Sequence, residues 1–162
     1  MGEDFRATFD RVFPRAELLA RRLTGDRSEA EDLAAEALSR AYARWGKLQH
    51  EPYVDGWILR VTANLAIDSI RRRSRRTVVE PAPADDPVVL RLALVAALRG
   101  LPRRQREVVA LRYLTDLSEE VVASALGLAP ATVRTHVHRA LVRLRGTLGA
   151  EFQENDFATD HP

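Results

Sequence analysis

The stretch WILRVTANLAIDSIRRRSRR, residues 57–76, decides the fold more than any other part of the chain. Read at 3.6 residues per turn, it predicts a helix with one broad apolar face, formed by Leu59, Ala63, Ala66, Ile67 and Ile70 and widened by Ile58, Val61 and Leu65. Along the opposite side runs a narrow polar stripe of Arg60, Asn64, Asp68, Arg71 and Arg75. A helix that is packed on most of its surface and cationic at one end suits a polyanion. A core helix with arginines solvated near its C-terminal dipole explains the same pattern.

Length and composition restrict the class of protein. The 162 residues suffice for one ordinary domain or two small ones. There is no cysteine, which excludes disulfides and cysteine-based zinc or redox sites. No apolar run reaches the roughly 18 residues of a membrane span, and residues 1–10 lack the pattern of a signal peptide. We therefore expect a cytoplasmic protein without membrane insertion.

The positive charge is concentrated in two islands. The net charge is only +2, and Lys47 is the single lysine among 25 basic residues. Residues 57–76 carry six arginines against one acid, and residues 130–145 carry four arginines and no acid, whereas residues 146–162 hold four acids and neither arginine nor lysine. Because phosphate binding follows the local field, these two islands matter more than the total charge. Genome composition is an alternative explanation for the heavy use of arginine.

The first third of the chain predicts two further helices. An apolar face begins at residue 5, and we expect Pro14 to kink or restart that helix and Gly25 to end it. Ser28 and Glu31 fit a capping box for the next helix. Its predicted buried stripe consists of Ala30, Leu33, Ala34, Ala37, Leu38, Ala41, Tyr42 and Trp45. Residues 47–56 read as a polar loop.

Residues 77–87, TVVEPAPADDP, predict an extended acidic linker because three prolines and three acids interrupt every periodic pattern. Eleven residues span at most about 35 Å, so flanking helical modules could reach separate sites on one DNA duplex. A loop inside a single helical domain is the alternative. Helical patterns resume at residue 88 and, after Pro102, again at residue 103.

Residues 118–145 form a helix-turn-helix pattern. Ser118 is a good N-cap, Gly127 allows the tight turn, Leu128 plugs the angle between the helices and Pro130 starts the second helix. The outward donors suited to base edges and phosphates are Thr132, Arg134, Thr135, His136 and Arg139. Two histidines two residues apart point to different sides of a helix, and no third ligand is evident, so we expect no metal. A helical hairpin with solvated arginines is the alternative.

Four blocks in this order resemble the extracytoplasmic-function group of bacterial RNA polymerase sigma factors: AEDLAAEALSRAY (30–42), WILRVTANLAIDSIRRR (57–73), LPRRQREVVALRY (101–113) and LSEEVVASALGLAPATVRTHVHRALVRLR (117–145). The resemblance covers about residues 5–147. It implies an all-α fold of two small helical domains, with sigma domain two at residues 1–76 and sigma domain four at 88–147. Residues 77–87 would form the linker, and 148–162 an acidic tail outside the match.

The resemblance also implies the partners. In that family the acidic helix, here Asp32, Leu33, Glu36 and Arg40, docks on the beta-prime clamp helices of core RNA polymerase. The segment 47–76 holds the minus-10 promoter element as an opened, single non-template strand. The second domain reads the minus-35 element in duplex DNA and contacts the beta flap. An anti-sigma factor is a further candidate partner. The family uses no cofactor and makes no bonds, so no enzyme activity is expected.

The residue chemistry agrees with these roles. Asn64 can donate to and accept from a base edge, and Tyr53 and Trp57 could stack on exposed bases, although Trp57 fits a core position better. Asp68 would repel phosphate, and we expect it to pair with Arg71 or Arg72. Phosphate contacts are expected from Arg60, Arg71, Arg72, Arg73, Arg75 and Arg76.

Three positions depart from the family pattern. Ala35 stands where the family usually has a glutamine, which removes one polar contact to polymerase. His136 replaces a common basic residue, and Ala129 replaces the usual polar N-cap. Two other functions fit parts of the sequence. One is a stand-alone helix-turn-helix regulator of the response-regulator output type, and the other is a sigma-like decoy that binds without initiating.

Overall fold

The computed structural model describes residues 4–74 and 86–149, and every element in these two ranges is helical. The order is α1 (Phe5–Thr24), α2 (Arg27–Ala43), α3 (Trp45–Leu48), α4 (Val54–Ser74), α5 (Pro87–Arg99), α6 (Arg103–Val109), the π-helical turn η1 (Ala110–Leu114), α7 (Glu119–Leu126) and α8 (Pro130–Leu148). The expected all-α fold is confirmed. The predicted linker lies almost wholly outside the described residues, and most of the predicted tail does too.

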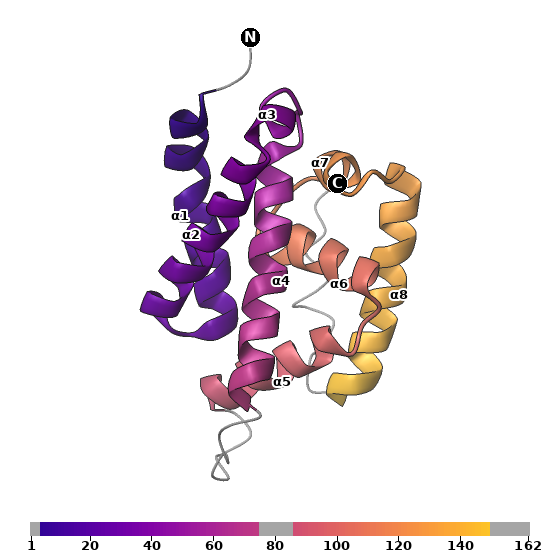
Figure 1. Cartoon of the computed structure of the whole chain (residues 1–162). Helices are drawn as coiled ribbons and strands as arrows, with labels where there is room; N and C mark the ends of the chain where they lie inside the picture. Colours follow the sequence, from indigo (N-terminus) through magenta and orange to yellow (C-terminus); the bar gives the residue numbers. More distant parts are fainter. Residues whose placement is uncertain (1–3, 75–85, 150–162) are drawn as a thin grey trace.

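The first half is a bundle of α1, α2 and α4 (Figure 1). Asp4 caps α1, and Gly25 ends it in the left-handed conformation at φ 70°, as its sequence position predicts. Helix α1 runs unbroken through Pro14, so the expected restart is wrong. The carboxylate of Asp55 in the first turn of α4 accepts from Arg11 at 2.7 Å and Arg15 at 3.2 Å, which ties α4 to α1.

Three expectations for α2 and the loop that follows are wrong. The N-cap of α2 is Asp26, whose side chain accepts from the backbone N–H of Glu29, and not Ser28. Asp26 directly precedes the helix, so its carboxylate, rather than the Ser28 hydroxyl, supplies the capping oxygen. Tyr42 is 63% exposed, because Phe5 covers only the edge of its ring. The predicted loop 47–56 is shortened at both ends by α3 and by the start of α4 at Val54.

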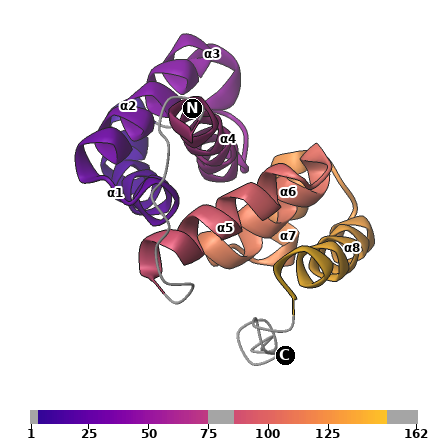
Figure 2. The same cartoon turned by 90° about the horizontal axis from the view of Figure 1, so that it is seen from below.

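Helix α4 is the centre of the molecule. All five predicted members of its apolar face are buried, and Ile58 is buried with them. Ile58 lies on a different side of the helix from Ile67, so α4 needs packing partners around most of its circumference. Helices α1 and α2 cover one side, and the second half of the chain covers another (Figure 2).

The second half consists of α5 to α8. Ser118 caps α7 through a bond from Val121 N–H, Gly127 makes the turn at φ 64°, and Pro130 begins α8, so the helix-turn-helix has the predicted turn chemistry. Ala129 gives α8 no side-chain cap, as expected from its chemistry. Val133, Ala140 and Leu144 bury α8 against α6 and α5.

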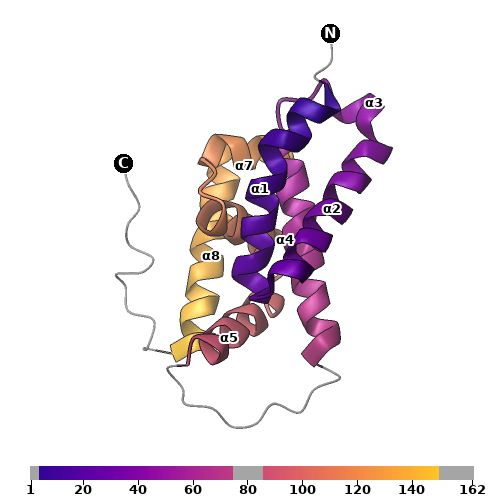
Figure 3. The same cartoon turned by 90° about the vertical axis from the view of Figure 1, so that its left-hand side faces the viewer.

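The two halves pack against each other in one continuous hydrophobic core. Helix α7 and the turn η1 lie against α4, and α5 lies beneath the end of α1 (Figure 3). A methyl group built on Gly56 of α4 would come within 2.6 Å of Cβ of Ala125 in α7, so glycine is needed for this approach. The guanidinium of Arg22 also donates to the carbonyl of Leu114 at 2.7 Å. No helix in the described part of the chain has the length and apolar character needed to cross a membrane.

Replacing Gly56 with alanine should weaken the contact between the halves. The added methyl overlaps Ala125, and such overpacking costs about 1–3 kcal/mol. Alanine is more stable than glycine inside a helix by only about 0.5–1 kcal/mol, which offsets part of this cost. We expect the free energy of unfolding in urea to fall by about 1 kcal/mol. Gly46→Ala in α3 is the matched control, because no atom lies within 4 Å of its added methyl, and it should be neutral or stabilising. Equal stability of the two variants would contradict the close packing.

Candidate functional site

The polar stripe of α4 faces the second half of the chain. Arg60 and Asn64 are both half-buried there. Asn64 Nδ2 donates to Oε1 of Glu107 in α6 at 3.0 Å, while Asn64 Oδ1 is buried without a partner among the described residues. The side chain best suited to read a base is therefore engaged by a carboxylate in this closed arrangement.

Glu107 contacts the polar stripe, and the sequence analysis did not predict this. Its side chain is only 1% exposed. Besides Asn64, it accepts from Arg103 at 3.1 Å and from Arg104 at 3.2 Å. The two arginines compensate the buried charge, and their spacing of three and four residues before Glu107 is visible in the sequence. The contact to Asn64, 43 residues away, leaves no local signal.

Arg60 lies in a crowded cationic environment. Burial lowers the pKa of its guanidinium, and the carboxylate of Glu107 opposes this change. The nearby charges of Arg104, Arg103 and Arg44 lower the pKa further. Since an arginine keeps its proton at any physiological pH, Arg60 stays positively charged between α4 and α6.

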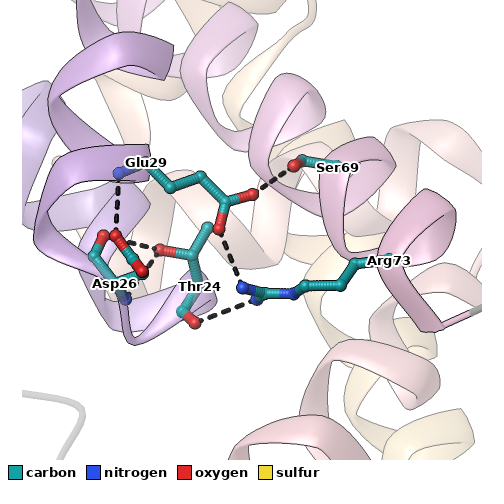
Figure 4. A network of polar contacts seen from close by, with 5 residues as sticks. All are labelled: Thr24, Asp26, Glu29, Ser69 and Arg73. Atoms are coloured by element: carbon teal, nitrogen blue, oxygen red, sulfur yellow. Dashed lines mark hydrogen bonds and ion pairs between the residues drawn. The ribbon is translucent and has the colours of Figure 1, made fainter. Parts of the chain in front are cut away.

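The cationic end of α4 is only partly free. Arg73 donates to the carbonyl of Thr24 at 3.2 Å and forms an ion pair with Glu29 at 3.0 Å, and Ser69 also binds Glu29 (Figure 4). This network joins α4 to the start of α2, so Arg73 has a structural role that the phosphate-binding expectation did not include. Arg71 and Arg72 are exposed at the same end. Arg75 and Arg76 lie outside the described residues.

The two candidate stacking residues, Trp57 and Tyr53, are both at least partly buried. Trp57 is only 9% exposed, with the Arg44 guanidinium 5.7 Å from its ring centroid, so the core interpretation is correct and stacking on a base is not possible in this arrangement. Tyr53 is half-buried against the core. Asp68 is exposed and has no ion pair among the described residues, which contradicts the expected pairing with Arg71 or Arg72.

The recognition residues of α8 are accessible. Thr132, Arg134, Thr135 and Arg139 are exposed, whereas His136 is half-buried and its Nδ1 atom has no partner within residues 4–74 and 86–149. Arg134 forms an ion pair with Glu119 of α7 at 2.5 Å, which holds its guanidinium beside the turn. Helices α6 and α7 separate α8 from α4 (Figure 1), so the two predicted DNA-binding surfaces lie on different helices that do not adjoin. No group of three potential metal ligands occurs in residues 4–74 or 86–149.

The predicted polymerase-binding face of α2 is also accessible. Asp32, Glu36 and Arg40 are exposed, and Leu33 is half-buried against the core. Glu36 and Arg40 form an ion pair at 2.8 Å along the helix. Helix α2 packs on α1 and α4 with its other side, and Arg40 also lines a cavity with Arg103 and Arg106 of α6.

Comparisons with known proteins identify the family. The Sigma-70 region 2 model matches residues 8–76, and the Sigma-70, region 4 model matches residues 91–144. The chain is 37% identical over 138 residues to the RNA polymerase sigma-E factor of Streptomyces coelicolor, covering 81% of this chain and 78% of that protein. It is 28% identical over 151 residues to the ECF RNA polymerase sigma factor SigW of Bacillus subtilis, covering 80% and 81%.

Two solved structures share the fold. The sigma factor RpoE of Bartonella quintana, in complex with the anti-sigma factor NepR, matches with a TM-score of 0.57 and 25% identity over 91% of this chain and 98% of that one. CnrH in complex with the cytosolic domain of CnrY matches with a TM-score of 0.59 and 23% identity over 91% and 88%. With both regions matched in order and the helices arranged as in these proteins, the chain belongs to the extracytoplasmic-function group of sigma-70-type RNA polymerase sigma factors.

Proposed function

We propose that this sigma factor divides promoter recognition between its two halves, with residues 1–76 reading the minus-10 element and residues 88–147 the minus-35 element. One observation carries the proposal. The acidic face of α2 and the recognition face of α8 are exposed, whereas the Asn64 face of α4 is covered by Glu107. Binding to core polymerase through α2 would come first, and α4 would read DNA only after the halves separate.

The acidic face of α2 suits a basic partner surface. Asp32 and Glu36 present carboxylates, and Arg40 orients Glu36 through its ion pair. In the proposed complex these side chains, with Leu33 at the edge of the core, contact the beta-prime clamp helices. Electrostatic complementarity of this kind raises the association rate and fixes the register of docking.

Separation of the halves would release Arg60 and Asn64 for an opened strand. Arg71, Arg72, Arg75 and Arg76 would hold its phosphates, and Tyr53 would lie at the entrance of the same face. Trp57 would not contact the strand, because its side chain is buried. On α8, Thr132, Arg134, Thr135 and Arg139 would contact duplex DNA, with His136 at the edge of that surface.

The remaining partners follow from the family. One structural neighbour is a sigma factor bound to an anti-sigma factor, and the other is CnrH bound to the cytosolic domain of CnrY. We propose that an anti-sigma protein also binds this chain and that the beta flap of polymerase contacts its second half. The protein would act in the cytoplasm, where its DNA is, and would perform no bond-making step itself.

Run-off transcription with purified core polymerase tests the function. Promoter-specific transcripts should appear only when the full chain is added. Tight, specific binding of duplex DNA by the isolated chain without any transcript would indicate a stand-alone regulator. Binding to core polymerase without initiation would indicate a decoy. Either outcome would overturn the proposal.

Asn64→Ala should lower initiation in a sequence-dependent way. Loss of a bidentate base contact costs about 1–3 kcal/mol of discrimination at one position, so promoters with different minus-10 bases should converge in strength. Arg72→Ala is the control, because Arg72 is exposed and would hold phosphate only. It should weaken all promoters alike and flatten the salt dependence. Equal losses on every promoter for Asn64→Ala would rule out base reading by that residue.

A further inference from the structure

Seven arginines line the groove between the two halves. Its central cavity has a volume of about 350 Å³, small for a ligand site, and is lined by Arg40 of α2, Arg60 and Asn64 of α4, and Arg103 and Arg106 of α6. Two adjoining cavities share residues with it and extend it along α4. They add Arg44 and Trp57 at one end, and Arg71 and Arg99 at the other.

The positive charge of the central cavity is poorly compensated. Among the described residues, the carboxylates that line this cavity or pair with its arginines are Asp68 in the wall, Glu36 on Arg40, and Glu107, which is divided between Arg103 and Arg104. Arg60 and Arg99 have no carboxylate within ion-pair distance in the described ranges. The repulsion on Arg60 from Arg104, Arg103 and Arg44 agrees with this excess of positive charge.

Two polar atoms in the groove are buried and unsatisfied. Arg106 Nε has a hydrogen to donate and no acceptor among the described residues, and Asn64 Oδ1 can accept and has no donor. Both residues line the central cavity. Buried polar groups without partners are uncommon in native proteins, and an absent ion is one physical explanation for them. Here the missing partner must supply acceptor oxygens to several arginines and one donor group to Asn64.

We propose that this groove binds a compact oligophosphate, either inorganic or the phosphate chain of a nucleotide. Phosphate oxygens match the arginine fork, and a hydroxyl or amino group of a nucleoside would satisfy Asn64. The ligand differs from promoter DNA, because Arg103 and Arg106 face α4 only while the halves are together. A ligand held by both halves stabilises that arrangement. Bound oligophosphate would therefore oppose the separation that minus-10 reading needs.

Isothermal titration calorimetry on the full chain tests the proposal with two probes, sodium tripolyphosphate and ATP without magnesium. Sodium sulfate at matched ionic strength is the reference for non-specific screening. Arg106→Ala should weaken binding about tenfold or more, as expected for a charged hydrogen bond. Arg99→Ala, at the exposed end of the groove, should weaken it several-fold. Arg143→Ala removes the same charge from the exposed face of α8 and should leave the affinity unchanged.

The titrations distinguish a nucleotide from an inorganic oligophosphate as the ligand of the groove. Tighter binding of ATP than of tripolyphosphate assigns the donor group to a nucleoside, and equal binding assigns the site to the phosphate chain alone. If sulfate gives as much binding heat as tripolyphosphate, the proposal is overturned. It is also overturned if Arg106→Ala and Arg99→Ala both bind with unchanged affinity while their circular dichroism spectra show a native fold. Such a failure leaves the proposed sigma function intact, because run-off transcription measures that function without any added oligophosphate.

Discussion

Reversal of two charges on α2, Asp32→Lys with Glu36→Lys, should abolish promoter-specific transcription by removing core polymerase binding. Both carboxylates are exposed on one face of the helix. Placing like charges against a complementary surface costs several kcal/mol, so binding should weaken by a factor of about 100 or more. The measurement is the affinity of the full chain for core polymerase, followed by run-off transcription.

The controls distinguish docking from folding. Each single reversal should give an intermediate loss, and Glu36→Lys should also repel Arg40, its partner in the helix. Asp10→Lys reverses an exposed acid on α1, outside the proposed surface, and should leave polymerase affinity unchanged. Binding of minus-35 duplex DNA by α8 should be the same in all variants. Retained polymerase binding by the double variant would show that α2 is not the docking helix.

Much of the fold was predictable because its signals are local. The apolar face of residues 57–76 is visible at helical spacing, and the five residues that form it are buried, whereas Val61 and Leu65 at its margin are partly buried. Gly127 and Pro130 mark the turn of the helix-turn-helix, and Ser118 marks its start. The N-cap of α2 was misassigned because Asp26 and Ser28 offer the same chemistry two residues apart, and only the backbone conformation chooses between them.

The candidate site was less predictable because its contacts are long-range. The spacing of Arg60 and Asn64 indicated a polar stripe, but nothing near them in the sequence indicates that α6 covers it. Glu107 has the local pattern of a solvated helix acid with two arginines, and only tertiary packing buries it. The pairing expected for Asp68 rested on helical spacing alone, and such exposed pairs contribute little free energy. Arg73 likewise forms a long-range ion pair, with Glu29 of α2.

In the closed arrangement Asn64 is held against Glu107, so the proposed mechanism requires the two halves to separate. This requirement can be tested by locking the halves together. The chain has no cysteine, so one introduced pair is unambiguous. Cysteines at Gly56 and Ala125 would place their Cβ atoms at 2.6 Å, and a shift of about 1 Å gives the separation that a disulfide needs. Oxidation would then hold α7 on α4 and keep Asn64 against Glu107. The two single-cysteine variants control for the substitutions themselves.

Run-off transcription by this double-cysteine protein, oxidised and then reduced in the same preparation, is the most direct measurement of the proposed mechanism. We expect the oxidised protein to give no promoter-specific transcript above the core polymerase background, and reduction to restore it. Recovery on reduction would show that the locked protein is folded and that separation of the halves is required for reading. Equal transcription in the oxidised and reduced states would contradict that requirement.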